Sequence, residues 1–166
     1  MTTDAPSAEY SRALAENARY AAQFDRSTLS PARRLAILAC MDGRLTIEDI
    51  FGLRTGDAHI IRNAGGLATD DALRSLVISQ RLLDTRELLV VAHTGCGMLT
   101  FRDDELRAQL AADTGVALGL TFHAFSDLEA SLRAQVERIR SHPWLRDMAV
   151  HGVVYEVETG RVREIA

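Results

Sequence analysis

The chain has 166 residues, of which 47% are hydrophobic and 25% charged, and its formal net charge at pH 7 is −4. This composition is ordinary for one globular domain, and the negative charge excludes a general attraction to nucleic acid or to an anionic membrane. No apolar stretch approaches the roughly 20 residues of a membrane-spanning helix, and residues 1–6 lack the basic and apolar regions of a secretory signal. We expect a single domain over residues 1–166, in the cytoplasm, where thiols stay reduced.

Helices and strands are expected to alternate along the chain. Residues 8–24 have the apolar spacing of an amphipathic helix and belong to an N-terminal helical arm at residues 1–32. Residues 35–40 are continuously apolar, as in a parallel strand that is covered on both faces. The elements expected after that strand are a short helix at 46–53, a strand at 59–63, a helix at 70–83, a strand at 87–92, a helix near 103–112, a helix over 128–139, a strand at 150–157 and a last strand at 162–165.

Local signals mark the ends of several of these helices. Thr69 is a candidate N-cap, and Asp70 and Asp71 follow it at the positive end of the helix dipole. Ser126 and Glu129 have the spacing of a capping box. Strands that alternate with helices in this way indicate an α/β fold, with a central, mainly parallel β-sheet flanked by helices.

Chemically useful side chains stand where three of the expected strands end. Cys40, Asn63 and His93 each fall at the carboxyl end of an expected strand, and Cys96 follows His93 by three positions. Because ligands bind beyond the carboxyl ends of strands in open α/β sheets, these side chains are expected to meet at one edge. Two thiolates and an imidazole are a ligand set suited to zinc, and they leave a fourth position for water. We therefore predict a Zn²⁺ ion, one per chain, on Cys40, His93 and Cys96.

A carboxylate and a guanidinium lie close to the first thiolate in the sequence. Asp42 is well placed to accept the proton of a zinc-bound hydroxide, and Arg44 would keep Asp42 ionised and fixed through paired N–H donors. Without the two cysteines, a surface salt bridge would be the simpler interpretation. Between predicted metal ligands, the pair indicates metal-assisted hydration or hydrolysis.

The motifs together resemble those of the β-class carbonic anhydrases. The resemblance runs from about residue 33 to the C-terminus and is closest to the small archaeal-type and mycobacterial branch. The three blocks that carry it, in this order and spacing, are Cys40-x-Asp42-x-Arg44, Arg62-Asn63-Ala64-Gly65 and His93-Thr94-Gly95-Cys96-Gly97.

The resemblance implies zinc on the two cysteines and His93, with Asp42 and Arg44 as a catalytic dyad that orients the zinc-bound hydroxide. It implies reversible conversion of carbon dioxide and water to bicarbonate and a proton. It also implies a homodimer in which the N-terminal helix extends to the partner, close to the active sites. Some relatives hydrolyse carbon disulfide on the same scaffold, so the resemblance leaves the substrate open. Many close relatives have Asp where this chain has Gly95, and the upstream Gln of the plant-type branch is absent.

Several alternatives are open at this point. Cys40 and Cys96 could form a disulfide or act as a redox switch, although they are not a Cys-x-x-Cys pair. Asp42 could occupy the fourth zinc position and close the site, which would give a zinc protein without turnover. A phosphate-binding interpretation of the glycines at 65 and 66 is disfavoured because the chain contains no lysine, so backbone geometry near the site explains them better. Asp103 is interpreted simply as part of an acidic helix start.

Overall fold

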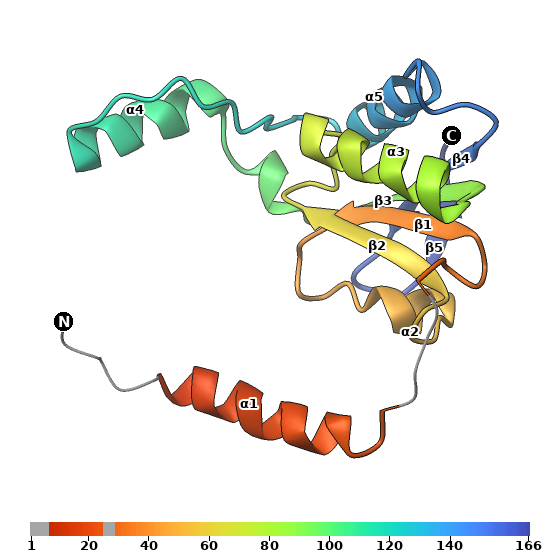
Figure 1. The fold of residues 1–166 in the computed structure, drawn as a ribbon. Coiled ribbons are helices and arrows are strands. Elements are labelled where there is room, and N and C mark those ends of the chain that lie inside the picture. The colour runs from red at the N-terminus through yellow and green to blue at the C-terminus, as the bar shows by residue number, and fades with distance from the viewer. Residues whose placement is uncertain (1–6, 25–28) are drawn as a thin grey trace.

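The computed structural model describes residues 7–24 and 29–166, and its centre is a five-stranded sheet (Figure 1). The strand order is β2-β1-β3-β4-β5, in which the first four strands are parallel and β5 runs antiparallel to β4. The mainly parallel sheet and the final hairpin are therefore confirmed. The strands are β1 (Leu35–Cys40), β2 (Ala58–Asn63), β3 (Glu87–His93), β4 (Ala149–Tyr155) and β5 (Val162–Glu164).

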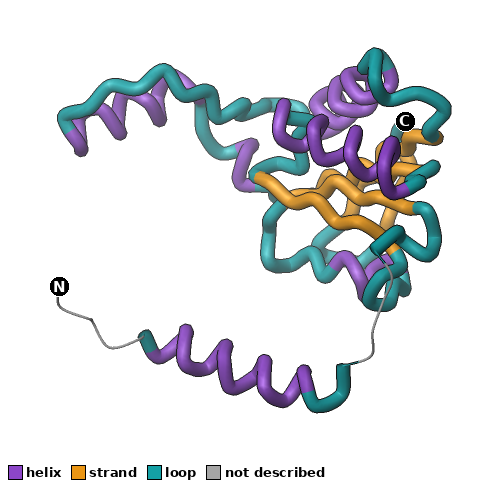
Figure 2. Tube along the Cα trace, viewed as in Figure 1, coloured by secondary structure: helices purple, strands orange, loops and turns teal. Residues whose placement is uncertain are grey.

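Helices cover both faces of this sheet. In Figures 1 and 2, α3 and α5 lie above the strands, and the short α2 lies below them. The helices are α1 (Ala8–Ala21), α2 (Ile47–Phe51), α3 (Asp70–Leu83), the 3₁₀ turn η1 (Gly97–Leu99), α4 (Asp103–Thr114) and α5 (Leu128–Arg140). Within the described residues, no helix has both the length and the apolar character needed to cross a membrane.

The continuous apolar run of β1 reflects burial on both faces. Ala36 and Leu38 belong to the core under α3 and α5, whereas Ile37 and Ala39 belong to the core on the α2 side. All four side chains are fully buried. Because successive side chains of a strand point to opposite faces, a strand between two helical layers needs apolar residues at every position.

The helix ends mostly follow the local signals, with one correction. The Thr69 hydroxyl accepts a hydrogen bond from the backbone N–H of Ala72, as an N-cap does. The capping box at Ser126 is wrong by one position, because Asp127 is the N-cap of α5 and its carboxylate accepts from the N–H of Ala130 at 3.0 Å. A carboxylate also interacts favourably with the helix dipole, which a hydroxyl does not.

Element boundaries differ from expectation mainly in the N-terminal part. The first helix ends at Ala21 instead of residue 24, and residues 1–6 and 25–28 of the expected arm lie outside the described residues. The turn η1 was not expected, because three residues are too few to show a helical period. The strand β4 ends at Tyr155, two residues earlier than expected.

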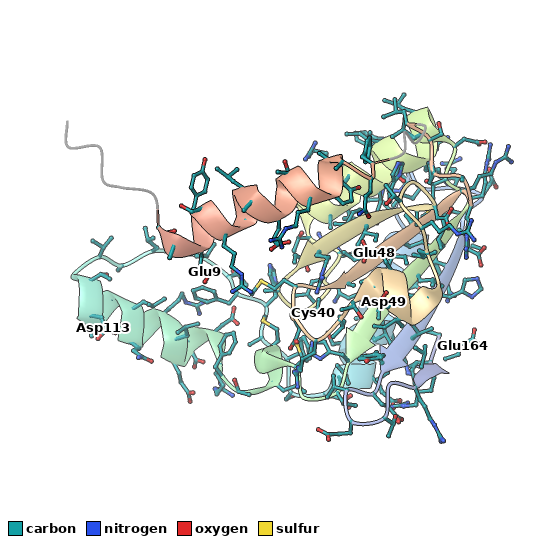
Figure 3. The ribbon with its side chains drawn as sticks, turned by 90° about the horizontal axis from the view of Figure 1, so that it is seen from below. Glu9, Cys40, Glu48, Asp49, Asp113 and Glu164 are labelled. Atoms are coloured by element: carbon teal, nitrogen blue, oxygen red, sulfur yellow. The ribbon has the colours of Figure 1, made fainter. Side chains whose placement is uncertain are left out.

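Two helices project away from the sheet. Neither α1 nor α4 has a buried residue, and Figures 1 and 3 show both extending beyond the carboxyl ends of the strands. Figure 3 labels Cys40 at that end of the sheet, with Glu9 on α1 and Asp113 on α4 farther out. Exposed apolar side chains on α1, on α4 and just beyond them are Tyr10, Leu14, Tyr20, Phe24, Leu110, Val116, Leu118 and Leu120.

Candidate metal centre

Three metal-ligating side chains meet where adjacent parallel strands end. Cys40 is the last residue of β1, His93 is the last residue of β3, and Cys96 directly precedes η1. Their ligand atoms all lie within 4.8 Å of one another, and all three residues are buried. The structure therefore brings the predicted ligand residues together. Their two sulfur atoms and one imidazole nitrogen form a donor set that suits zinc.

The two cysteines are free thiols. Their sulfur atoms are 4.0 Å apart, far beyond the roughly 2.05 Å of a disulfide bond. The sulfur of Cys96 is within hydrogen-bonding distance of the sulfur of Cys40, and this contact lowers the pKa of Cys40. The same contact, together with burial, raises the pKa of Cys96. The Cys40 thiolate therefore forms more readily than the Cys96 thiolate, and a bound cation would favour the thiolate form of both residues.

The orientation of His93 leaves one ring nitrogen available. With the tautomer assigned from its neighbours, Nδ1–H donates to the carbonyl of Thr94 at 3.0 Å. The other nitrogen, Nε2, is buried, and among the described residues it has no hydrogen-bond partner. A buried, unpartnered nitrogen is costly unless it binds something, and a second bond from the opposite nitrogen is the usual arrangement of a metal-ligating histidine. The donor set therefore fits a metal ion.

Asp42 and Arg44 form a close ion pair beside these ligands. The Asp42 carboxylate accepts from Arg44 Nε at 2.9 Å, from Arg44 Nη2 at 2.7 Å and from the Arg44 backbone N–H at 2.9 Å. The guanidinium contact, followed by the backbone contact, holds the pKa of Asp42 well below its usual range. Arg44 Nη2 also donates to the carbonyl of Gly95 at 3.0 Å, which links the two ligand-bearing loops. Asp42 Oδ2 lies 3.8 Å from His93 Nε2.

The turn after β2 shapes the floor of the site. Asn63 does not reach the ligands, because its side chain accepts from the N–H of Leu67 and donates to the carbonyl of Leu67, both at 2.7 Å. Gly66 has φ +64°, and a Cβ there would lie 2.9 Å from the backbone nitrogen of Cys40 and 3.1 Å from the carbonyl oxygen of Val91. The expected close backbone approach at Gly66 is therefore confirmed.

An open pocket of about 400 Å³ leads to the sulfur atoms. Cys40, Cys96 and Asp42 are among its lining residues, and the remainder of the lining is largely apolar. Such a pocket suits a small, weakly polar substrate that reacts beside a few polar groups. The lining residues are Cys40, Met41, Asp42, Ala64, Gly65, Cys96, Gly97, Met98, Thr100 and Phe101.

Comparison with known proteins agrees with this geometry. Residues 35–162 match the carbonic anhydrase family. The chain is 40% identical over 154 residues to β-carbonic anhydrase 1 of Mycobacterium tuberculosis, covering 92% of this chain and 94% of that protein. The chain belongs to the β-carbonic anhydrase family.

Two further relatives describe the range of this family. A crystal structure of a carbonic anhydrase from Streptococcus mutans has a TM-score of 0.90 at 40% identity, covering 98% of this chain and all of that one. A carbon disulfide hydrolase of Acidithiobacillus thiooxidans is 37% identical, covering 79% of this chain and 76% of that protein. The β-carbonic anhydrase fold is therefore shared by proteins named for two different substrates.

Sequence reasoning missed some residues that shape this β-carbonic anhydrase site. Thr94 joins the His93 loop to the end of β4, since its N–H donates to the carbonyl of Tyr155 and its hydroxyl accepts from the N–H of Val157. Arg62 donates from Nε to the backbone carbonyl of Cys40. Both residues stand inside the recognised motifs, which is the one signal that could have drawn attention to them.

Proposed function

We propose that this chain is a zinc-dependent carbonic anhydrase that interconverts carbon dioxide and water with bicarbonate and a proton. The observation that carries the proposal is the buried Cys40, His93 and Cys96 cluster, in which an unpartnered His93 Nε2 faces the Asp42 carboxylate. The family relationship supports the same reaction, because the relative from M. tuberculosis is named a β-carbonic anhydrase.

The three ligands would hold the zinc ion and leave one position for water. Zinc in such a site lowers the pKa of its water to about 7, so that the nucleophile is available at neutral pH. The Thr94 carbonyl keeps the His93 ring in the orientation that presents Nε2 to the ion. The backbone N–H of Gly65, 3.4 Å from the Cys40 sulfur, favours the thiolate form of that ligand.

Asp42 and Arg44 are proposed to manage the proton of the attacking oxygen. Because Arg44 lowers the pKa of Asp42, the carboxylate is ionised at neutral pH. An ionised carboxylate can only accept a hydrogen bond, so Asp42 would fix the proton of the nucleophile and leave its lone pair directed into the pocket. The apolar wall formed by Met98 and Phe101 would admit carbon dioxide without competing for that lone pair.

Two alternative functions are open for this site. The relationship to carbon disulfide hydrolases makes carbon disulfide the alternative substrate. A closed zinc site with Asp42 as fourth ligand would give a protein without turnover. The paired contacts of Arg44 to both Asp42 oxygens favour the open form, because Asp42 would have to lose them in order to move.

We further propose that the protein works as a homodimer in a reducing compartment such as the cytoplasm. The exposed apolar residues of α1, among them Leu14 and Tyr20, would pack on a second copy. The arm at residues 1–32 would then reach the partner, since α1 extends past the carboxyl ends of the strands of its own sheet (Figure 3). A reducing compartment keeps both thiols available as ligands.

The decisive experiment combines zinc analysis with stopped-flow kinetics on the purified full chain. We expect about one zinc per chain and carbon dioxide hydration that increases through neutral pH. Hydrogen sulfide release from carbon disulfide, measured on the same preparation, separates the two substrates. Full zinc content with turnover of neither substrate would contradict the proposal and favour the closed site.

A further inference from the structure

Arg62 holds the backbone that carries Asp42. It lies in β2 opposite Ala39 of β1. Its Nε donates to the carbonyl of Cys40 at 3.0 Å, and its Nη2 donates to the carbonyl of Asp42 at 2.6 Å. These two carbonyls stand on either side of Met41, so one planar guanidinium spans the whole segment between a metal ligand and the dyad carboxylate.

This segment has little packing of its own. The parallel ladder continues one residue past β1, where the N–H of Met41 donates to the carbonyl of Asn63 at 2.9 Å. The Met41 side chain is 67% exposed and therefore cannot anchor the chain in the core. After Met41 the backbone turns, and the carbonyl of Asp42 accepts from the N–H of Leu45 at 3.1 Å. Arg62 donates to the same carbonyl and so braces the turn from the neighbouring strand.

The charge of Arg62 is directed at these carbonyls. Among the described residues it has no carboxylate within 4.0 Å, whereas Arg44 contacts both oxygens of Asp42. The two arginines therefore have separate tasks: Arg44 orients the Asp42 side chain, and Arg62 orients the backbone from which that side chain extends. A lysine at position 62 could contact one carbonyl as a point charge but could not form the planar pair of bonds.

We propose that Arg62 is a positioning residue for the hydration reaction, acting through the backbone of Cys40 to Asp42. This inference rests on the proposed function. We call the two hydrogen bonds from Arg62 to the carbonyls of Cys40 and Asp42 the clamp. With the clamp in place, Asp42 Oδ2 is held 3.8 Å from His93 Nε2, next to the metal ligands. Without it, the segment samples other positions and the carboxylate spends less time aimed at the nucleophile. Small displacements of this kind are costly for a group whose role is orientation.

The test compares zinc-loaded Arg62→Met and Arg62→Lys with the parent. Arg74→Met is the matched control, because Arg74 is an exposed arginine whose contacts are with Asp71 on its own helix. For Arg62→Met we expect kcat to fall on the order of 10- to 100-fold with KM almost unchanged, and Arg62→Lys to lie between it and the parent. Arg74→Met should behave as the parent does.

A second readout is independent of activity. Hydrogen exchange at the Leu45 amide reports the turn that Arg62 braces, and we expect it to accelerate in Arg62→Met and to stay at the parental rate in Arg74→Met. If Arg62→Met fails to fold or to retain zinc, Arg62→Lys decides the question by the same two readouts.

Several outcomes would overturn the positioning role. A parental kcat in Arg62→Met, or parental exchange at Leu45, would each refute it. A higher KM for bicarbonate with kcat unchanged would also refute it, because that result describes an arginine that binds the substrate directly. A parent protein that turns over no carbon dioxide would instead refute the proposed function, and the exchange measurement would still judge the clamp separately.

Discussion

At the residue scale, each side chain of the site uses some of its polar atoms in hydrogen bonds and leaves others available. His93 donates from Nδ1 to a carbonyl and has no hydrogen-bond partner for Nε2 among the described residues, and the sulfurs of Cys40 and Cys96 are 4.0 Å apart. Asp42 has its two oxygens on Arg44. Each group is thus prepared for a single role, and each role can be tested with one substitution.

The metal site should depend on both thiols. Replacing Cys96 by Ser should remove or greatly weaken zinc binding, because a hydroxyl is not deprotonated as a thiol is and is a poor ligand for zinc. The measurement is zinc content after dialysis against a mild chelator. His151→Gln, at a histidine on β4 distant from the ligand cluster, should retain the metal. Full zinc occupancy in Cys96→Ser would make the assignment wrong.

The acidic residue should matter for turnover more than for folding. Asp42→Asn is nearly isosteric and should retain zinc and fold, yet slow hydration by roughly 10²–10⁴, the range for lost acid–base assistance. Asp49→Asn, at an exposed position of α2, is the control (Figure 3). An Asp42→Asn enzyme that keeps its zinc and turns over at the parental rate would show that the dyad is misassigned.

The Asp42–Arg44 pair also predicts a pH effect. Because the pKa of Asp42 is lowered, its ionised form contributes stability above the ordinary carboxyl pKa of about 4 and loses it only as the pH falls through the lowered value. An activity change near neutral pH therefore cannot be the titration of Asp42. In Arg44→Ala the freed carboxylate competes for the metal, most strongly at lower pH, so the pH–rate profile should shift upward. A parental profile would count against this role of Arg44.

At the element scale, two connecting segments contact the site, since the turn between β2 and α3 packs on β1 and Phe122 of the loop after α4 contacts Phe101 of the pocket lining. The turn brings Gly66 against the backbone of β1. The loop is held by Asp103, whose carboxylate accepts from the N–H groups of Phe122, His123 and Ala124. Asp103 is thus more than an acidic helix start, because it fixes a segment about 20 residues away to the first turn of α4.

The Gly66 position should tolerate no side chain. Gly66→Ala combines an unfavourable positive φ with a Cβ 2.9 Å from the Cys40 nitrogen, and both effects add to about 2–5 kcal/mol of lost stability. Denaturant unfolding at fixed protein concentration measures the loss. Gly119→Ala is the control, since a Cβ there meets nothing within 4 Å. Equal stability of the two variants would contradict the close approach.

The Asp103 tether should be visible in hydrogen exchange. The N–H of Ala124, followed by those of His123 and Phe122, lowers the pKa of Asp103, so the tether holds above the ordinary carboxyl pKa and is lost as the pH falls. Asp103→Asn should speed exchange at the Phe122 and Ala124 amides at neutral pH. Asp104→Asn, whose carboxylate contacts only the neighbouring side chain of Arg102 and nearby N–H groups, should not. Unchanged exchange in Asp103→Asn would refute the tether.

At the scale of the whole molecule, helices cover both faces of the sheet, whereas no other element buries a residue of α1 or α4. Both helices lie beyond the carboxyl ends of the strands, where the metal ligands are, and both expose apolar side chains (Figures 1 and 3). An isolated copy would leave this surface in water, which soluble proteins generally avoid. A partner that packs there would also limit access of solvent to the pocket.

The proposed dimer can be tested by sedimentation. The full chain should sediment as a dimer at micromolar concentration, and a chain shortened to residues 29–166 should dissociate and lose activity, because it lacks the apolar face of α1. Leu14→Asp tests the same face without shortening the chain. A full-length chain that is a stable and active monomer would count decisively against the dimer.

The sequence by itself determined the features that depend on near neighbours. The periodicity located the strands and α3, and the three strand ends at Cys40, Asn63 and His93 agree with the structure. The order of the motifs identified the family. Strand burial, helix caps and turns depend on residues that are close in the sequence, so the sequence pattern can predict them. The meeting of the strand ends could also be predicted, because parallel strands bring their carboxyl ends to one edge of the sheet.

Only the tertiary structure decided the distance between the two sulfurs and several contacts between segments that are far apart in the sequence. It placed the sulfurs of Cys40 and Cys96 4.0 Å apart although 56 positions separate them. It directed the Asn63 side chain to the backbone of Leu67 instead of toward the ligands. It also gave Arg62 its contacts with the backbone of β1 and Asp103 its contacts with a distant loop. Such contacts follow from the packing of whole elements, and no spacing within one segment of the sequence encodes them.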